Sequence, residues 1–163
     1  MVWPLQKDVA LYYGNPDADH NGEPDRAWED ANLVRVVPPW KMYLAWDPAT
    51  QIKNIRIHRL CASSLGSVLG TIWARYGQMQ GHIEEDRLHL FGGAYTFRLM
   101  RRSSKLSMHS YGCAIDLDPE HNQMGAHQWT MPPKVIGAFQ GEGWAWGGDW
   151  STPDAMHFQA ARV

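Results

Sequence analysis

The first half of the chain alternates between strand-like and helix-like spacing of its apolar residues. Residues 33–37 and 42–46 are rich in β-branched and aromatic side chains and flank two prolines, which predicts two short strands around a proline turn. Residues 54–58 alternate apolar and polar positions, as a strand does. The stretch 62–76 then places apolar residues at helical spacing, so we expect a helix there, ended by Gly77.

The second half predicts further short strands and one more helix. Residues 88–100 have strand composition with a bend at a Gly-Gly pair, and 113–118 form a short apolar run typical of a buried strand. A short helix should begin at Pro132–Pro133 and end near Gly141, and the segment AMHFQAA predicts a last strand. Short strands with segregated helices predict an α+β fold with a small antiparallel sheet, in a single domain spanning residues 1–163.

Residues 14–32 are rich in Gly, Pro, Asn and Asp, which predicts a long loop. Asp17, Asp19 and Asn21 have the spacing that begins a calcium-binding loop. The twelfth position, however, holds Trp28, where such a loop needs a bidentate glutamate. We therefore expect a loop here without calcium.

Composition and charge exclude several classes of function. With 44% hydrophobic and 20% charged residues and a formal net charge of -2, the chain has the composition of a soluble globular protein. Its main cationic cluster, Arg98, Arg101, Arg102 and Lys105, is too short and interrupted to predict nucleic-acid binding. No apolar run approaches the ~18 residues that cross a membrane, and the start lacks the pattern of a secretory signal. We expect a soluble cytoplasmic chain with neither nucleic-acid nor membrane partners.

Two residue types that often carry function have ordinary interpretations here. Cys61 and Cys113 lie in apolar segments, which predicts buried reduced thiols rather than a disulfide or metal knuckle. Nine tryptophans are many for this length. Trp144, Trp146 and Trp150 lie near glycines, and they fit either a core or a groove that binds a polar ligand.

The segment LSMHSYGCAIDLD, residues 106–118, offers His109 and Asp116 as metal ligands. A hydrolytic zinc site needs a third ligand of nitrogen or oxygen type, and the C-terminal segment DAMHF provides His157. Asp154, three residues before His157, could take a proton from the attacking water and deliver it to a leaving amine. A lone histidine is more often structural than a ligand, so either segment alone is weak evidence.

Alternative histidine pairs are weaker candidates for a metal site. His82 with His89, and His121 with His127, have no accompanying carboxylate and glycine pattern and lie in loop-like sequence. Asp118 follows Asp116 by two positions and therefore shares its strand face, where it could orient a ligand. Its place near the strand end favours an exposed side chain instead.

Taken together, the two segments resemble a known family of zinc peptidases. The pattern SxHxxGxAxD is present at residues 107–116, and the second motif is present as WGGDWSTPDAMHF, residues 146–158. The chain is similar to the zinc peptidases that include D-alanyl-D-alanine carboxypeptidases, vancomycin-resistance D,D-peptidases and phage L-alanyl-D-glutamate endolysins, whose fold the hedgehog signalling domain shares. The upstream element YTFR resembles the phage branch, and weaker similarity extends to ALYYGNP and IRIHRLCASSL.

The resemblance implies a role for each matching residue. It implies one Zn²⁺ held by His109, Asp116 and His157, with Asp154 as general base and acid. It also implies that the guanidinium of Arg98 binds the scissile carbonyl oxygen or a substrate carboxylate. By the same resemblance, three residues would contact the substrate or support the site structurally: Tyr95, Ser107 and Trp146.

The expected function is therefore that of a monomeric zinc peptidase of bacterial peptidoglycan. We expect a phage or prophage endolysin that hydrolyses the L-alanyl-D-glutamate bond of the stem peptide. It would stay in the host cytoplasm until a holin opens the route to the cell wall. A D-alanyl-D-alanine carboxypeptidase is the alternative, with Arg101, Arg102 or Lys105 binding the terminal carboxylate. A non-catalytic zinc-containing binding module is the second alternative, which the presence of both Asp154 and Arg98 disfavours. A phage tail or baseplate component with this fold is also open.

Overall fold

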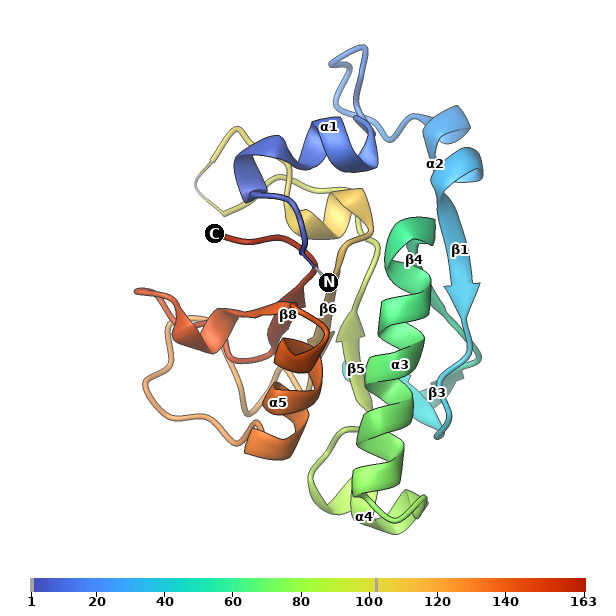
Figure 1. The fold of residues 1–163 in the computed structure, drawn as a ribbon, viewed down its shortest axis with the longest axis vertical. Helices are drawn as coiled ribbons and strands as arrows, with labels where there is room; N and C mark the ends of the chain where they lie inside the picture. The colour runs from blue at the N-terminus through green and yellow to red at the C-terminus, as the bar shows by residue number, and fades with distance from the viewer. Residues whose placement is uncertain (1, 102) are drawn as a thin grey trace.

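Two β-sheets and five α-helices form the fold in the computed structural model, which describes residues 2–101 and 103–163 (Figure 1). The smaller sheet pairs β1 (Leu33–Val36) with β4 (Ile55–His58) in antiparallel orientation. The larger sheet has the strand order β3-β2-β5-β6-β8-β7. Its strands are β2 (Met42–Leu44), β3 (Asp47–Ile52), β5 (Leu90–Gly93), β6 (Ala114–Leu117), β7 (Ala145–Trp146) and β8 (His157–Gln159).

The α+β class is confirmed, but the larger sheet is mixed rather than antiparallel. Strand β2 pairs with β5 in parallel, with Tyr43 opposite Leu90 and Leu44 opposite Phe91. Between these strands the chain passes through β4 and the longest helix, and a crossover of this kind is what a parallel pair requires. The other strand pairs of this sheet are antiparallel.

The proline turn does not join two paired strands, because β1 and β2 belong to different sheets. Trp40, just after the prolines, is buried, and its indole Nε1 donates a hydrogen bond to the Leu88 carbonyl over 3.1 Å. This contact directs the chain toward β5, so that β2 pairs with β5 while β1 pairs with β4.

The central helix α3 (Arg59–Arg75) begins earlier than its apolar pattern predicts. His58 caps it, because its Nδ1 accepts a hydrogen bond from the Leu60 amide over 3.1 Å. Helix α5 (Pro133–Gly141) has the predicted bounds and packs beside α3 (Figure 1). Ser64 of α3 donates to Glu142 over 3.0 Å and accepts from Trp144 over 2.9 Å, which ties the two helices together.

The predicted loop at 14–32 contains a helix, α2 (Arg26–Asn32). Asp25 caps it by accepting hydrogen bonds from the Ala27 and Trp28 amides. Trp28 is buried and its Nε1 donates to the Tyr13 carbonyl over 3.0 Å. The residue at the twelfth position of the supposed calcium loop is therefore a packing anchor. Helices α1 (Val9–Tyr13) and α4 (Gln80–Glu85) were also not predicted.

The two ends of the chain lie together (Figure 1). Leu5 bridges to Arg162 in parallel, and the Gln6 amide donates to the Arg162 carbonyl over 2.7 Å. Cys61 and Cys113 are buried free thiols, as predicted, and burial raises the pKa of Cys61 to about 12. Across the described residues, no helix combines the length and apolar character needed to cross a membrane.

Candidate metal centre

His109 lies on a short 3₁₀ turn, η2 (Met108–Tyr111), which precedes the strand β6. The Ser107 hydroxyl caps this turn by accepting from the His109 amide over 3.3 Å. Gly112 ends it with a positive φ of 63°, and a Cβ there would lie only 2.7 Å from Leu33 Cδ2 and 2.9 Å from the His58 amide nitrogen. Glycine at 112 is thus required by both its backbone conformation and the close packing, and it turns the chain from His109 into β6.

Asp116 and His157 are direct neighbours across the antiparallel pair of β6 and β8. Residues opposite each other on adjacent strands point to the same face of the sheet, so the carboxylate and the imidazole meet there. Gly92 of β5 lies against Asp116, where an added Cβ would come within 3.0 Å of Asp116 Cβ and 3.1 Å of its carbonyl oxygen. The close approach of β5 thereby fixes the backbone that carries Asp116.

Three potential ligand atoms converge at this point. His109 Nε2 lies 3.2 Å from Asp116 Oδ2 and 3.2 Å from His157 Nδ1, and His157 Nδ1 lies 2.9 Å from Asp116 Oδ1. Both imidazoles are buried. In the described part of the chain this is the one group of three or more His, Cys, Asp or Glu residues that could hold a metal ion.

The remaining ring nitrogens show which atoms would bind the metal. His109 Nδ1 lies 2.6 Å from the Ala94 carbonyl oxygen, and His157 Nε2 lies 3.1 Å from the Gln159 side-chain oxygen. Because these partners are acceptors, they stabilise the ring proton on His109 Nδ1 and on His157 Nε2. In that state the lone pairs of His109 Nε2 and His157 Nδ1 face each other beside the Asp116 carboxylate, an arrangement that a cation stabilises. Two imidazoles and one carboxylate are a ligand set that suits Zn²⁺.

The electrostatics of the group fit a cation site. Burial alone would raise the pKa of Asp116, but the two imidazoles lower that pKa well below its usual range. Burial alone would lower the pKa of His157, but the Asp116 carboxylate, together with Asp154 and the hydrogen bond to Gln159, raises it, so the net shift is upward. Both shifts favour positive charge next to an ionised Asp116.

Asp154 lies beside these three residues. Its amide donates to the Gly147 carbonyl over 2.8 Å, and its own carbonyl accepts from the His157 amide over 3.0 Å. The carboxylate atom Oδ1 is buried and has no hydrogen-bond partner among the residues that the structure describes. Burial, together with the Asp116 carboxylate, raises the pKa of Asp154, although the imidazoles act against this. A buried carboxylate oxygen without a partner is costly, which indicates a partner supplied by a ligand or water.

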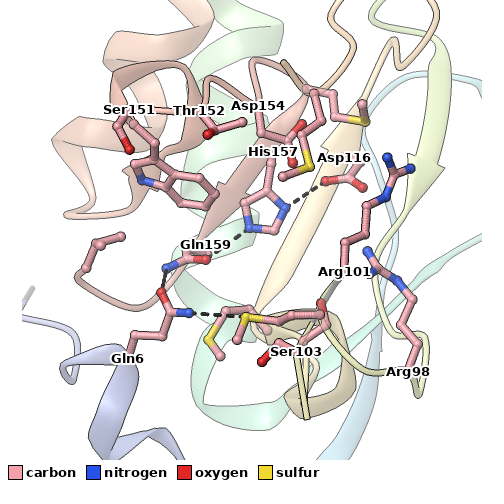
Figure 2. Close-up of a pocket in the computed structure, with 17 residues that line it drawn as sticks. Gln6, Arg98, Arg101, Ser103, Asp116, Ser151, Thr152, Asp154, His157 and Gln159 are labelled. Carbon is pink, nitrogen blue, oxygen red and sulfur yellow. Dashed lines mark hydrogen bonds and ion pairs between the residues drawn. The ribbon is translucent and has the colours of Figure 1, made fainter. Parts of the chain in front are cut away.

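A cleft of about 440 Å³ opens over Asp116, Asp154 and His157 (Figure 2). Arg98 and Arg101 lie on one side, and Figure 2 shows the Arg101 guanidinium directed toward Asp116. Apolar side chains supply much of the remaining wall: Met100, Met108, Met124, Met156 and Trp150. The cleft therefore combines a candidate metal group, a free carboxylate, two cations and an apolar surface.

The structure brings only some of the predicted substrate contacts to this cleft. Arg98 and Ser107 line it. Tyr95 instead packs under the Arg56 guanidinium at 4.9 Å, and burial raises its pKa. Trp146 is buried and donates from Nε1 to the Ala155 carbonyl over 2.9 Å. Neither Tyr95 nor Trp146 lines the cleft.

The other tryptophans near glycines divide between core and cleft. Trp144 is a core residue, whereas Trp150 lines the cleft, with its ring 5.3 Å from that of His157. Among the cations considered for a terminal carboxylate, Arg101 lines the cleft and Arg102 lies outside the described residues.

Asp118 is buried, and the prediction of an exposed side chain is wrong. Its carboxylate accepts from Arg87 Nε over 3.0 Å, lies 2.8 Å from His121 Nδ1, and accepts from Asn122 Nδ2 over 3.2 Å. The backbone turns sharply there, with φ of 43°. These contacts organise the loop that follows β6 and are separate from the candidate ligands.

Sequence reasoning missed two glutamines that line the cleft: Gln159, which contacts His157, and Gln6, which contacts Gln159 (Figure 2). Gln159 is two residues beyond His157 on β8, and alternate residues of a strand share a face. That spacing was a usable signal for Gln159. Gln6 is distant in sequence, and no local pattern links it to the site.

Comparison with known proteins connects this site to a peptidase family. A family model described as D-alanyl-D-alanine carboxypeptidase matches residues 101–160. The matched segment contains all three candidate ligands and Asp154. No curated protein and no solved structure matches the chain. The family match and the convergent His-Asp-His group together indicate a metallopeptidase.

Proposed function

We propose that this protein is a zinc-dependent peptidase that hydrolyses the L-alanyl-D-glutamate bond in the stem peptide of bacterial peptidoglycan. The observation that carries the proposal is the buried Oδ1 of Asp154, which has no hydrogen-bond partner among the described residues and lies beside three convergent ligand atoms. A purely structural zinc site closes its fourth position and needs no adjacent base. The match to a peptidase family supports the same chemistry.

In this proposal the zinc ligands are His109, Asp116 and His157. When bound, zinc would act as a Lewis acid on the scissile carbonyl and make water a stronger nucleophile near neutral pH. Asp154 would take the proton of the attacking water at its free Oδ1 and deliver it to the leaving amine. Its backbone is held on both sides by hydrogen bonds to Gly147 and His157, so the carboxylate keeps its place beside the centre.

The two arginines would bind negative charge on the substrate. Arg98 is held near the centre through its backbone, because its amide donates to Ser110 Oγ over 2.9 Å and its carbonyl accepts from the same hydroxyl over 2.7 Å. A guanidinium there can stabilise the oxyanion or pair with a carboxylate. The D-glutamate after the scissile bond carries a free α-carboxylate, and the L-alanine before it carries a methyl group that suits the methionine-lined wall.

A D-alanyl-D-alanine carboxypeptidase is the second candidate, and the description of the matching family favours it. Its substrate also has a carboxylate on the residue after the scissile bond, so Arg98 and Arg101 suit both substrates. The two substrates differ beyond that residue, because the D-glutamate continues into the rest of the stem peptide, whereas a terminal D-alanine does not. The aspartate at the base position and the YTFR element favour the endopeptidase, as a lysis enzyme of a phage or prophage.

The test is digestion of defined muropeptides, with new termini read by mass spectrometry. Wild type is compared with Asp154→Asn, and with Asp149→Asn as a matched control, because Asp149 is an exposed aspartate on the same segment. We expect cleavage between L-alanine and D-glutamate that a chelator abolishes, that Asp154→Asn lowers by about 10²–10⁴-fold, and that Asp149→Asn preserves.

Other outcomes would replace the proposal. Release of a single terminal D-alanine would identify the carboxypeptidase. Zinc binding without cleavage of any muropeptide would identify a binding module.

A further inference from the structure

We propose that Gln159 is a positioning residue for His157, and that Gln6 of the N-terminal segment completes this support. Gln159 would fix the tautomer and the ring orientation in which His157 offers Nδ1 to the metal. The inference rests on the proposed metal centre. It extends that centre to Gln6, which lies outside the segment that the peptidase family model matches.

The contacts of Gln159 determine which way its amide points. The side chain is buried, with 1% of its surface exposed. Its Nε2 lies 3.0 Å from the Ala161 carbonyl oxygen, and a carbonyl can only accept. The amide nitrogen must therefore be on that side, which leaves Oε1 facing His157 Nε2 at 3.1 Å.

This orientation favours the state of the imidazole that a metal needs. Since Gln159 Oε1 is an acceptor, it stabilises a proton on His157 Nε2, whereas Asp116 Oδ1 competes for a proton on Nδ1 unless a cation lies between them. With the proton on Nε2, the lone pair of the neutral ring is on Nδ1, the atom that lies 2.9 Å from Asp116 Oδ1 and 3.2 Å from His109 Nε2. An outer partner that holds a ligand histidine in this manner raises metal affinity by fixing the tautomer and the ring.

Gln6, near the N-terminus, supports the side-chain amide of Gln159, near the C-terminus. It begins the short helix η1 (Gln6–Asp8), and its backbone is tied to the C-terminal segment by the 2.7 Å hydrogen bond from its amide to the Arg162 carbonyl. Its Oε1 accepts from Gln159 Nε2 over 3.4 Å, and its own Nε2 contacts Met100 Sδ at 3.5 Å. Figure 2 shows the resulting chain of contacts from Gln6 through Gln159 to His157.

Glutamine suits position 159 because the site needs an acceptor and a donor in one neutral group. Leucine has neither. Glutamate keeps an acceptor for His157 but turns a second oxygen toward the Ala161 carbonyl, where two acceptors repel. Gln159→Leu and Gln159→Glu therefore separate loss of the contact to His157 from loss of the contact to Ala161.

Zinc affinity, measured by competition with a chromophoric chelator, is the first test. We expect Gln159→Leu to weaken Zn²⁺ binding about 10–100-fold. Gln159→Glu should retain more affinity than Gln159→Leu, and Gln6→Leu should have a smaller effect than either. Gln140→Leu is the control, because Gln140 is an exposed glutamine with a side-chain partner at Asp149, away from the centre. Equal affinity of wild type and Gln159→Leu would overturn the inference.

The metal-bound state of His157 gives a second test that does not need activity. Long-range ¹H–¹⁵N spectra of the zinc-bound wild type should show the remaining ring proton of His157 on Nε2, next to Gln159 Oε1. A proton on Nδ1, with zinc on Nε2, would overturn the inference even if the Gln159 variants do not fold. A wild type that binds no zinc would instead refute the proposed function, whereas zinc bound equally by wild type and Gln159→Leu would refute only the role of Gln159.

Discussion

The amide of Asp154 donates to the carbonyl of Gly147 over 2.8 Å, and a Cβ at position 147 would overlap the Asp154 carbonyl oxygen. The proposed catalytic carboxylate thus lies against a residue whose lack of a side chain permits this approach. The same carbonyl oxygen of Asp154 accepts the amide of His157, so a displacement at 147 would reach both residues.

Gly147→Ala should therefore impair the site and the fold together. Inserting a methyl group into this contact should lower the free energy of unfolding by about 1–3 kcal/mol. Hydrolysis of muropeptides should also fall, because Asp154 and His157 move relative to Asp116. Urea unfolding and initial rates measure the two effects. Gly141→Ala is the control, since nothing lies within 4 Å of a Cβ there. Equal behaviour of the two alanine variants would show that position 147 does not constrain the site.

The sequence was sufficient to predict the helices and the candidate ligands that depend on local spacing. Helix α5 has the expected bounds because Pro133 begins it and its apolar residues repeat at helical spacing. The pattern from His109 to Asp116 identified two of the residues that converge, and DAMHF identified the other two. The metal itself and the roles of these residues stay predictions.

Features that depend on distant partners could not be predicted. The parallel pairing of β2 with β5 follows from the Trp40 anchor and the crossover between them, neither of which local spacing records. Helix α2 is short and polar, and it is stabilised by the Asp25 cap and by the contact of Trp28 with Tyr13. The burial of Asp118 depends on Arg87 and on the loop that closes over it.

Zinc should stabilise the folded protein. A ligand present at 100 times its dissociation constant adds about 2.7 kcal/mol when only the folded state binds it. We expect the melting temperature to rise with Zn²⁺ and to fall again with a chelator. Asp116→Asn should remove the rise, because the site loses its anionic ligand. His127→Gln should keep it, since His127 is exposed. A rise that survives in Asp116→Asn would place zinc elsewhere.

Asp118 should stabilise the loop after β6 through its charge. Asp118→Asn keeps a residue type that tolerates the positive φ of 43°, but it weakens the contacts to Arg87 and His121. Hydrogen bonds to charged groups contribute roughly 1.5–3 kcal/mol each, so we expect a loss of about 2 kcal/mol in urea unfolding. Asp118→Ala should lose more, because alanine also strains that backbone. Asp118 is not among the candidate ligands. In Asp118→Asn the free energy of zinc binding should therefore change by less than the free energy of unfolding.

His58 should make the stability of the fold depend on pH. It is buried, its Nδ1 caps α3, and its Nε2 lies 3.1 Å from the Tyr13 carbonyl. Burial lowers its pKa in the folded protein from 6.5 to about 4. Between pH 6.5 and about 4 the unfolded chain therefore binds more protons at His58 than the folded protein does. The neutral His58 contributes fully to the free energy of unfolding above pH 6.5, and this contribution is lost as the pH falls toward 4.

The loss attributable to His58 is at most roughly 3.4 kcal/mol, from 1.36 kcal/mol for each pKa unit. His58→Asn is the matched variant, because asparagine also caps helices well but does not titrate. It should be less stable than wild type near neutral pH, since it loses the contact with Tyr13, and it should lose less stability on acidification to pH 4. Urea unfolding of both proteins across this range measures the difference. Parallel curves for the two would show that His58 takes up its proton equally in the folded and unfolded states.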